Sequence, residues 1–452
     1  MKIIFNIFVL TICANSISFG QCWTTVSSGA HHNVAIKEDG TLWTWGWNSS
    51  GELGDGTNND KYFPVQIGNS TNWKDVSAGD NFCLVLMKNG TLWSFGNNNF
   101  GQLGDGTFAN KNSLTQVGTD SNWIYISCGD AHSSYGIKQN GTLWAWGQNT
   151  IGQLGDSTLI NRNAPVKIGS DSNWQSISGG GYYAIATKLN GTLWGWGKNN
   201  NGQLGDSTNI GKISPIQVGS STNWKKVNAG FDHAIAIKQN NTLWAWGTGI
   251  LGDSTVIGKN HPIQIGIDTN WSDIYAGGLH SLAIKSDMSL WAWGDNYFGQ
   301  IGDSTFIDRL YPISISNGNN WKIISIGAVH SQAINTAGEL FAWGVNQYGR
   351  LGDSTNVNKV HMVKINTLQC LPMSLSNNIL EQTNYFLYPN PVQNELFITA
   401  IVKKVRFKIV DVFNQTIIQG DVKPKQSINV EWLNPGLYVL IIENKIIKFV
   451  KK

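Results

Sequence analysis

Charged residues are scarce in this chain, because Asp, Glu, Lys and Arg make up only 13% of its 452 residues, with a net charge of +3. From Tyr385 onward, ten basic residues stand against five acidic ones, so the preceding part is slightly acidic. Binding to a phosphate backbone needs a basic stripe, and the larger part of the chain lacks one. We therefore expect no nucleic-acid partner.

Long hydrophobic runs are also missing after residue 20, and a bilayer span needs about 20 apolar residues. Residues 1–20 start with Lys2, continue with the apolar run Ile3–Ile12 and end in small and polar residues. This order predicts a signal peptide, with a retained membrane anchor as the alternative. We expect a chain that is exported through the periplasm, is secreted or stays at the cell surface, and has no transmembrane segment once mature.

Cysteine is rare, with five in the chain and one of them, Cys13, inside the predicted signal peptide. Disulfides persist in exported proteins. Cys22 and Cys370 bracket a repeat region, and the two ends of a closed ring must meet, so this pair is a candidate disulfide. Two free thiols are the alternative.

No convincing amphipathic helix is present, whereas Gly and Trp are abundant, at 51 and 21 residues. Asn-Gly and Asp-Gly pairs punctuate short apolar runs, which is typical of β-hairpins. The segment LWTWGWNSSGELGDGT from Leu42 returns six times, starting at Leu92, Leu143, Leu193, Leu243, Leu290 and Leu340. The spacing is 50, 51, 50, 50, 47 and 50 residues, and the fifth copy is three residues shorter.

Each copy lies in a unit that opens with a Trp and contains four predicted strands. In the second unit these are Trp73–Ala78, Phe82–Met87, Thr91–Phe95 and 115–117. The LWxWG strand is apolar at consecutive positions, so it must be covered on both faces. Seven stacked four-stranded units predict an all-β chain with a seven-bladed β-propeller over residues 21–368. An open solenoid is the architectural alternative, but the units lack polar-faced capping repeats.

The units also share the pattern G-x-x-H-x-x-A-I, as at Gly230, His233 and Ala236-Ile237. Together with LWxWG and GQLGD, repeated seven times, this pattern resembles the regulator of chromosome condensation repeat family, whose members are seven-bladed propellers. The family's founding member is a nuclear exchange factor for a small GTPase, but it uses a basic tail and further elements that this chain lacks. We expect no guanine-nucleotide exchange. Secreted bacterial members include a β-lactamase inhibitor that binds its target protein through propeller loops, which is the closer precedent.

A different domain is predicted for residues 385–452, after a polar linker at 369–384. Its markers are Tyr388-Pro389-Asn390-Pro391, Gly436-Leu437-Tyr438 and the basic end Lys451-Lys452. Short strands alternate with turns, which favours a small β-sandwich. The segment resembles the type A C-terminal sorting domain of the type IX secretion system. That resemblance implies the type IX machinery as a partner and either release or attachment at the cell surface. An adhesive sandwich domain is the alternative.

The repeated polar residues are interpreted as structural. Five His (His32, His132, His233, His280 and His330) are assigned to one slot of the repeat, which Phe82 and Tyr182 or Tyr183 fill in other units. The Asp of GDGT or GDST is expected to hold a turn rather than calcium. The chain has no GxSxG, HExxH or phosphate-binding loop. We expect no catalytic residue, cofactor or metal, and no enzyme.

The positions at which the repeats differ carry the functional hypothesis. Large apolar residues stand on the loops just before the loop glycine or just after GDxT, and such residues can anchor a partner. The alternative is that they cover the rim of the core. The candidates are Phe100, Phe108, Ile151, Leu159, Phe298, Phe306 and Tyr348.

The sequence therefore predicts a monomeric binding protein that recognises a protein or glycan through its propeller loops. An enzyme such as a lyase or hydrolase in the central channel, or a structural envelope protein, are the alternatives. A polar cluster in the channel that breaks the sevenfold pattern would favour the enzyme.

Overall fold

The computed structural model describes residues 22–316, 320–365, 387–398, 404–411, 415–424, 426–442 and 445–452. They belong to two compact units, one in residues 1–372 and one in residues 373–452. The predicted signal peptide and linker lie outside the described residues and stay predictions. No helix in the described part is long and apolar enough to cross a membrane.

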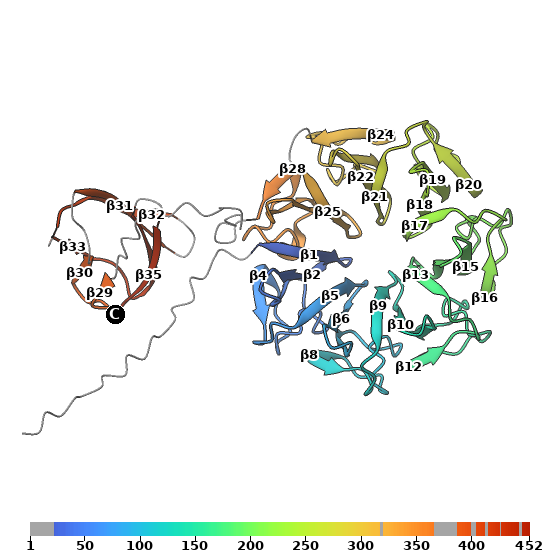
Figure 1. The fold of residues 1–452 in the computed structure, drawn as a ribbon, viewed down its shortest axis with the longest axis horizontal. Helices are drawn as coiled ribbons and strands as arrows, with labels where there is room; N and C mark the ends of the chain where they lie inside the picture. The colour runs from blue at the N-terminus through green and yellow to red at the C-terminus, as the bar shows by residue number, and fades with distance from the viewer. Residues whose placement is uncertain are drawn as a thin grey trace, which may run out of the picture. The chain divides into compact units, whose positions relative to one another are not determined.

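The first unit consists of seven four-stranded antiparallel sheets, each formed by four consecutive strands, arranged as blades around a ring (Figure 1). Blade 1 comprises β1 (Trp23–Ser28), β2 (His32–Lys37), β3 (Leu42–Gly46) and β4 (Lys61–Ile67). Blade 2 comprises β5 (Trp73–Ala78), β6 (Phe82–Met87), β7 (Leu92–Gly96) and β8 (Lys111–Gln116). Blade 3 comprises β9 (Trp123–Cys128), β10 (Ser133–Lys138), β11 (Leu143–Gly147) and β12 (Arg162–Lys167). Blade 4 comprises β13 (Trp174–Gly179), β14 (Tyr183–Lys188), β15 (Leu193–Gly197) and β16 (Lys212–Gln217).

Blade 5 comprises β17 (Trp224–Ala229), β18 (His233–Lys238), β19 (Leu243–Gly247) and β20 (Lys259–Ile265). Blade 6 comprises β21 (Trp271–Ala276), β22 (His280–Lys285), β23 (Leu290–Gly294) and β24 (Arg309–Ser316). Blade 7 comprises β25 (Trp321–Ile326), β26 (His330–Asn335), β27 (Leu340–Gly344) and β28 (Lys359–Lys364), with the short 3₁₀ turn η1 (Gln347–Gly349) after β27. The seven-bladed propeller is confirmed.

The core of the propeller lies between blades. Each of its seven apolar clusters draws residues from two neighbouring blades, and the cluster between blades 7 and 1 includes Trp23, Trp45 and Leu340. This arrangement explains the LWxWG strand, because Leu42 and Trp45 are fully buried on a strand with a blade on either side. Gly46 must be glycine, because its φ is +108° and a Cβ there would meet the backbone of His31.

The ring closes through contacts between blades 7 and 1. The backbone N–H of Trp23 donates to the carbonyl of Gly338 at 2.9 Å, and the amide of Asn33 donates to the carbonyl of Arg350 at 2.6 Å. The candidate disulfide is not tested, because Cys370 lies outside the described residues, and the pairing of Cys22 with Cys370 stays a prediction.

Two details differ from the sequence prediction. The fourth strand of blade 2 starts at Lys111, four residues before the predicted start, because this outermost strand is half exposed and its polar residues give a weak pattern. His132 does not share the slot of the other four His, since β10 starts at Ser133 and it is Ser133 that pairs with Gly147. The loop before Ser133 has one extra residue, which places His132 in the loop. Tyr183, not Tyr182, fills the slot in blade 4.

The second unit contains two sheets that share one apolar core, which includes Leu396, Phe407, Ile428 and Leu440. One sheet has the order β29 (Leu387–Tyr388), β30 (Glu395–Ile398), β33 (Ser427–Asn429). The other has the order β32 (Thr416–Val422), β31 (Val405–Val410), β34 (Gly436–Ile442), β35 (Lys445–Lys451). This is the predicted small two-sheet β domain.

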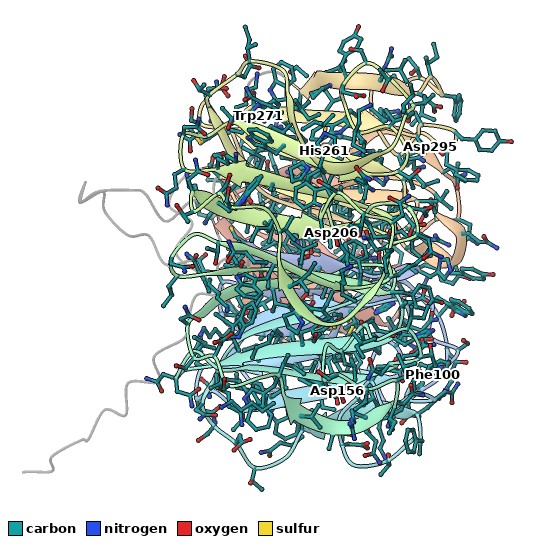
Figure 2. All side chains as sticks on the ribbon, turned by 90° about the vertical axis from the view of Figure 1, so that its right-hand side faces the viewer. Phe100, Asp156, Asp206, His261, Trp271 and Asp295 are labelled. Carbon is teal, nitrogen blue, oxygen red and sulfur yellow. The ribbon has the colours of Figure 1, made fainter. Side chains whose placement is uncertain are left out.

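The propeller has two unlike faces. Long connections between the third and fourth strands lie beside those between the first and second, because the Trp47 N–H donates to the His31 carbonyl and every other blade repeats this bond. We call this side the long-loop face. The short-turn face carries the turns between second and third strands and the connections from one blade to the next. Figure 2 shows Phe100 and Asp295 at one side of the propeller and Trp271 at the other.

Candidate binding face and central channel

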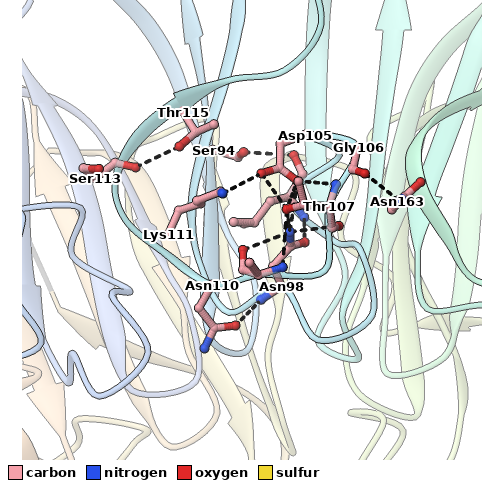
Figure 3. Close-up of polar contacts among 12 residues, drawn as sticks. Ser94, Asn98, Asp105, Gly106, Thr107, Asn110, Lys111, Ser113, Thr115 and Asn163 are labelled. Atoms are coloured by element: carbon pink, nitrogen blue, oxygen red, sulfur yellow. Dashed lines mark hydrogen bonds and ion pairs between the residues drawn. The ribbon is translucent and has the colours of Figure 1, made fainter.

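A buried Asn organises each long loop except that of the shortened fifth blade. In blade 2, the Asn98 side-chain amide donates to Asp105 at 3.0 Å and to the Thr107 carbonyl at 3.1 Å. Its carbonyl oxygen accepts from the Leu103 N–H at 2.9 Å. Figure 3 shows Asn98 together with Asp105 and Thr107 in this loop. Asn98 is fully buried, so its bonds fix the loop in one conformation.

The Asp of GDGT or GDST holds the turn, as the sequence predicted. Asp105 accepts from the backbone N–H and the hydroxyl of Thr107 at 2.9 and 2.8 Å, and Lys111 lies 3.3 Å away. Burial acts to raise the pKa of Asp105, but the bonds from Thr107, Lys111 and Asn98 outweigh it and lower the pKa. All seven blades have a basic residue six positions after this Asp, which is a repeated signal that the sequence reasoning missed.

The four buried His join neighbouring blades. The Nε2 atom of His280 lies 2.8 Å from the hydroxyl of Ser331, and that of His330 lies 2.9 Å from the amide oxygen of Asn33. Burial lowers the pKa of His280 to about 3, so the ring is neutral and cannot act as an acid at ordinary pH. These four His therefore pack between blades and make a hydrogen bond there, as the sequence predicts. In the described part of the chain, no group of three or more His, Cys, Asp and Glu is placed to hold a metal ion.

The candidates before the loop glycine lie at the inner part of the long-loop face. Phe100 stacks on His132 of the next blade, with ring centroids 5.1 Å apart, and Phe298 packs edge-on against Tyr297 at 4.9 Å. Tyr348 stacks on Trp47 at 5.3 Å, across the junction of blades 7 and 1. These rings therefore sit beside residues that the sequence reasoning did not select.

The candidates after GDxT lie farther out. The loop at Ser157 is bonded to the carbonyl of Ile213 on the outermost strand of the next blade, at 2.9 Å. Leu159 follows this loop and is exposed, as are Ile151, Phe108 and Phe306. The structure therefore divides the seven candidates between an inner group (Phe100, Ile151, Phe298 and Tyr348) and an outer group (Phe108, Leu159 and Phe306).

Several further aromatic and apolar residues belong to the inner part of this face. Tyr297 is 73% exposed, Phe231 and Leu279 are exposed, and Tyr182 packs edge-on against Phe231 at 6.5 Å. For Trp47 the sequence does carry a signal, because the residue directly after LWxWG differs in every unit: Trp47, Asn97, Gln148, Lys198, Thr248, Asp295 and Val345. On the outer part of the face, five units have an exposed Ile or Val as the second residue after GDxT: Ile160, Ile210, Ile257, Ile307 and Val357.

Carboxylates and basic groups both lie among these rings. Asp80 lies 3.8 Å from the Nε2 atom of His132, and Asp232 pairs with Lys198 at 3.0 Å. Arg350 is buried, and it donates from Nε to the Gln347 carbonyl at 3.0 Å. Burial and the charge of Arg350 lower the pKa of the neighbouring His31 to about 4.

The first strands of all seven blades line a central channel of about 510 Å³. Their fifth residues form a nearly uniform layer, in which the side chain accepts from a backbone N–H of the next blade; the Ser27 hydroxyl accepts from Ala78 at 2.9 Å. Six such bonds run around the channel. Tyr275 replaces the small residue in blade 6, where it hydrogen-bonds to Ser27 and Ser325.

The third residues of the same strands are not uniform. They are Thr25, Asp75, Tyr125, Ser176, Lys226, Asp273 and Ile323, and all line the channel. Lys226 pairs with Asp273 at 2.8 Å, whereas no side chain in the described residues donates to Asp75. A polar cluster thus breaks the sevenfold pattern inside the channel, which is the feature that the sequence analysis associated with an enzyme.

Comparison with known proteins places the chain in a family. The profile of the RCC1-like domain matches residues 12–252, and the profiles of the regulator of chromosome condensation (RCC1) repeat match residues 271–300, 289–334 and 337–379. The profile of the secretion system C-terminal sorting domain matches residues 386–452. This tail indicates export by type IX secretion to the cell surface or the outside.

Solved structures of low sequence identity share the fold. Yeast RCC1 (Prp20), in its complex with Kap60, is 20% identical, with a TM-score of 0.66 over 77% of this chain and 84% of that one. Human WBSCR16 is 21% identical, with a TM-score of 0.64 over 70% of this chain and 88% of that one.

A curated relative matches only locally. The ultraviolet-B receptor UVR8 of Arabidopsis thaliana is 45% identical over 42 residues, which is 9% of this chain and about a tenth of the receptor's length. Since the RCC1-like profile covers more than half of the sequence, the chain belongs to the RCC1-like domain family, and it carries a secretion system C-terminal sorting domain behind its propeller.

Proposed function

We propose that this exported propeller is a non-enzymatic binding protein that recognises a protein partner through the inner part of its long-loop face. The observation that supports this is a set of partly exposed aromatic rings at positions where the seven repeats differ. Trp47 with Tyr348, Tyr297 with Phe298, and Phe231 with Tyr182 form separate pairs around one face. A residue needed only for the fold would recur from blade to blade, as the buried Asn and His do.

The chemistry of the face fits a protein better than a simple glycan. Aromatic rings held on rigid loops are typical anchors of protein interfaces, because they bury a large area at a small cost in side-chain entropy. Asp80, whose side chain is 33% exposed, lies among them and favours a partner with a basic residue at the contact, whereas Asp232 is already paired with Lys198. The outer candidates Phe108, Leu159 and Phe306 would then extend the interface or cover the rim.

The test compares two variants of the full chain, immobilised at equal density and exposed to envelope and secreted proteins of the producing bacterium. The inner variant carries Tyr297→Ala, Phe231→Ala and Tyr348→Ala, and the outer variant carries Phe108→Ser, Leu159→Ser and Phe306→Ser. We expect the inner variant to capture at least tenfold less of the protein that the wild type captures.

The outer variant serves as the matched control, since it removes as many exposed apolar side chains from the same loops. Equal loss from both variants would move the site to the outer rim, and unchanged capture by the inner variant would refute the proposal. Capture of a glycan instead, measured on a glycan array, would replace the protein partner with a carbohydrate.

A further inference from the structure

The central channel contains negative charge that the protein does not neutralise. Among the described residues, three carboxylates line it, those of Asp75, Asp130 and Asp273, and the ammonium group that faces them, that of Lys226, pairs with Asp273. Lys225 also borders the channel, but its ammonium group bonds to Asn241 at 2.8 Å on the exposed side. In the part of the chain that the structure describes, Asp75 and Asp130 therefore have no cationic partner inside the channel.

Neither of these two carboxylates is satisfied by neighbouring side chains. Asp75 accepts only from the backbone N–H of Val76, at 2.9 Å, and no hydrogen bond or ion pair of Asp130 occurs among the described residues. Burial raises the pKa of Asp75, and burial together with Asp80 raises the pKa of Asp130 to about 7. A carboxylate in such surroundings is costly unless a positive group joins it.

Two aromatic side chains, those of Tyr125 and Tyr275, line the same channel as the carboxylates. Burial raises the pKa of Tyr125, and the charges of Asp75 and Asp273 add to the rise. The charges of Asp130 and Asp75 both act to raise the pKa of Tyr275, so its hydroxyl lies within electrostatic range of both carboxylates. Aromatic faces beside carboxylates favour an organic cation over a strongly hydrated metal ion, because the ring attracts the positive charge and also packs against hydrocarbon.

The two carboxylates lie at different depths. Asp75 is the third residue of β5, whereas Asp130 follows the end of β9 by two residues, in the connection to β10 on the long-loop side. At about 3.3 Å per residue, five positions of fully extended chain correspond to at most about 16 Å along the channel. An extended polyamine spans this distance, whereas a monoamine would reach only one of them.

We propose that the central channel binds a linear polyamine, whose ammonium groups pair with Asp75 and Asp130 while its hydrocarbon chain lies along Tyr125 and Tyr275. The channel volume of about 510 Å³ is in the range of small-molecule sites. Asp130 lies near Asp80 of the long-loop face, so this site adjoins the proposed interface, but polyamine binding does not depend on that interface. The protein binds the polyamine without converting it, since ion pairs and ring contacts account for binding.

The test uses the full chain and spermidine, with octane-1,8-diol as the neutral probe of similar length, measured by isothermal titration calorimetry. We expect saturable 1:1 binding of spermidine and none of the diol. Asp75→Asn and Asp130→Asn should each weaken binding at least tenfold. Glu38→Gln removes one exposed carboxylate from the short-turn face and should change the dissociation constant less than twofold.

The variants also separate binding from folding. Removing a half-buried charge that lacks a cationic partner should leave the melting temperature of Asp75→Asn equal to or above that of the wild type, while spermidine should no longer raise it. Tyr125→Phe keeps the ring and should keep the affinity for spermidine, whereas Tyr125→Leu should reduce that affinity several-fold.

A pH series gives an independent readout. Asp130 faces Asp80, Cys128, Tyr183 and Tyr275, and its raised pKa makes it partly protonated near neutrality. Spermidine affinity should therefore rise about tenfold from pH 6 to pH 8, and Asp130→Asn should abolish this rise. No saturable binding, unchanged affinity in both Asn variants, or chemical conversion of spermidine detected by mass spectrometry would overturn the proposal.

Discussion

The two faces of the propeller are built from the same seven repeats but differ in uniformity. On the short-turn face, a Lys ammonium lies over the rings of two Trp in five blades; Lys138 lies 3.8 Å from the ring centroid of Trp144 and 4.7 Å from that of Trp123. On the long-loop face, the residue after LWxWG differs in all seven blades. Positions where the repeats agree are explained by contacts within the fold, and positions where they differ are the ones left for recognition.

This comparison can first be tested at the uniform interior, where acid should unfold the propeller. Burial lowers the pKa of His32, His233, His280 and His330 far below the ordinary 6.5, to about 3 or 4 for the first three. The unfolded chain therefore binds more protons, so the stability is fully present above pH 6.5 and is lost as the pH falls. At pH 5 each buried His lowers the free energy of unfolding by about 2 kcal/mol relative to neutral pH. The four together lower it by about 8 kcal/mol, which is comparable to the total stability of a domain.

The measurement is the melting temperature of the full chain between pH 8 and pH 4.5. His280→Phe imitates Phe82 in the same slot of blade 2, and it should reduce the loss of stability at pH 5 by about 2 kcal/mol. His261 is exposed on β20, so His261→Gln is the control and should leave the pH dependence unchanged. A pH profile of His280→Phe that coincides with that of the wild type would contradict the role of the buried rings.

A second uniform feature is the buried Asn of the long loops. Asn98→Ala removes a fully buried group that bonds to Asp105, Thr107 and Leu103, and it should lower the free energy of unfolding by about 3 to 5 kcal/mol. Denaturant unfolding measures this loss. Asn99 is exposed in the same loop, so Asn99→Ala should cost less than about 0.5 kcal/mol, and similar losses from both would show that the buried network is not what holds the loop.

The sequence predicted the ring, the blade count and the turn role of Asp105 because each is repeated seven times, and repetition makes a weak local signal strong. The assignment of His132 to the repeat slot was wrong, because the one-residue insertion leaves a His directly beside the true slot residue, Ser133. The sequence failed to identify Asp75, Asp130 and Tyr275 because channel-lining residues show no pattern along the strand. Only the closed ring brings together side chains from blades 2, 3 and 6.

A substitution on the short-turn face should have a smaller effect on the free energy of unfolding. Lys138→Met imitates Met87 of blade 2 and removes a ring contact and an ion pair with Asp120 at 2.7 Å, so it should cost about 1 kcal/mol. High salt should weaken the ion pair more than the ring contact, so most of the loss should persist in 0.5 M NaCl. A loss that vanishes in salt would assign the stabilisation to the surface ion pair instead.

The variable face should show the smallest effect on stability. Tyr297 is 73% exposed and packs only edge-on against Phe298, so Tyr297→Ala should change the free energy of unfolding by less than about 0.5 kcal/mol. Its uniform counterpart is Trp293 in the same blade, which is fully buried and donates to the Leu251 carbonyl at 3.1 Å; Trp293→Ala should cost at least about 3 kcal/mol. Denaturant unfolding of both variants measures the difference. If Tyr297→Ala proved as costly as Trp293→Ala, the aromatic residues of the long-loop face would belong to the core, and the separation between what builds this propeller and what it presents to a partner would fail.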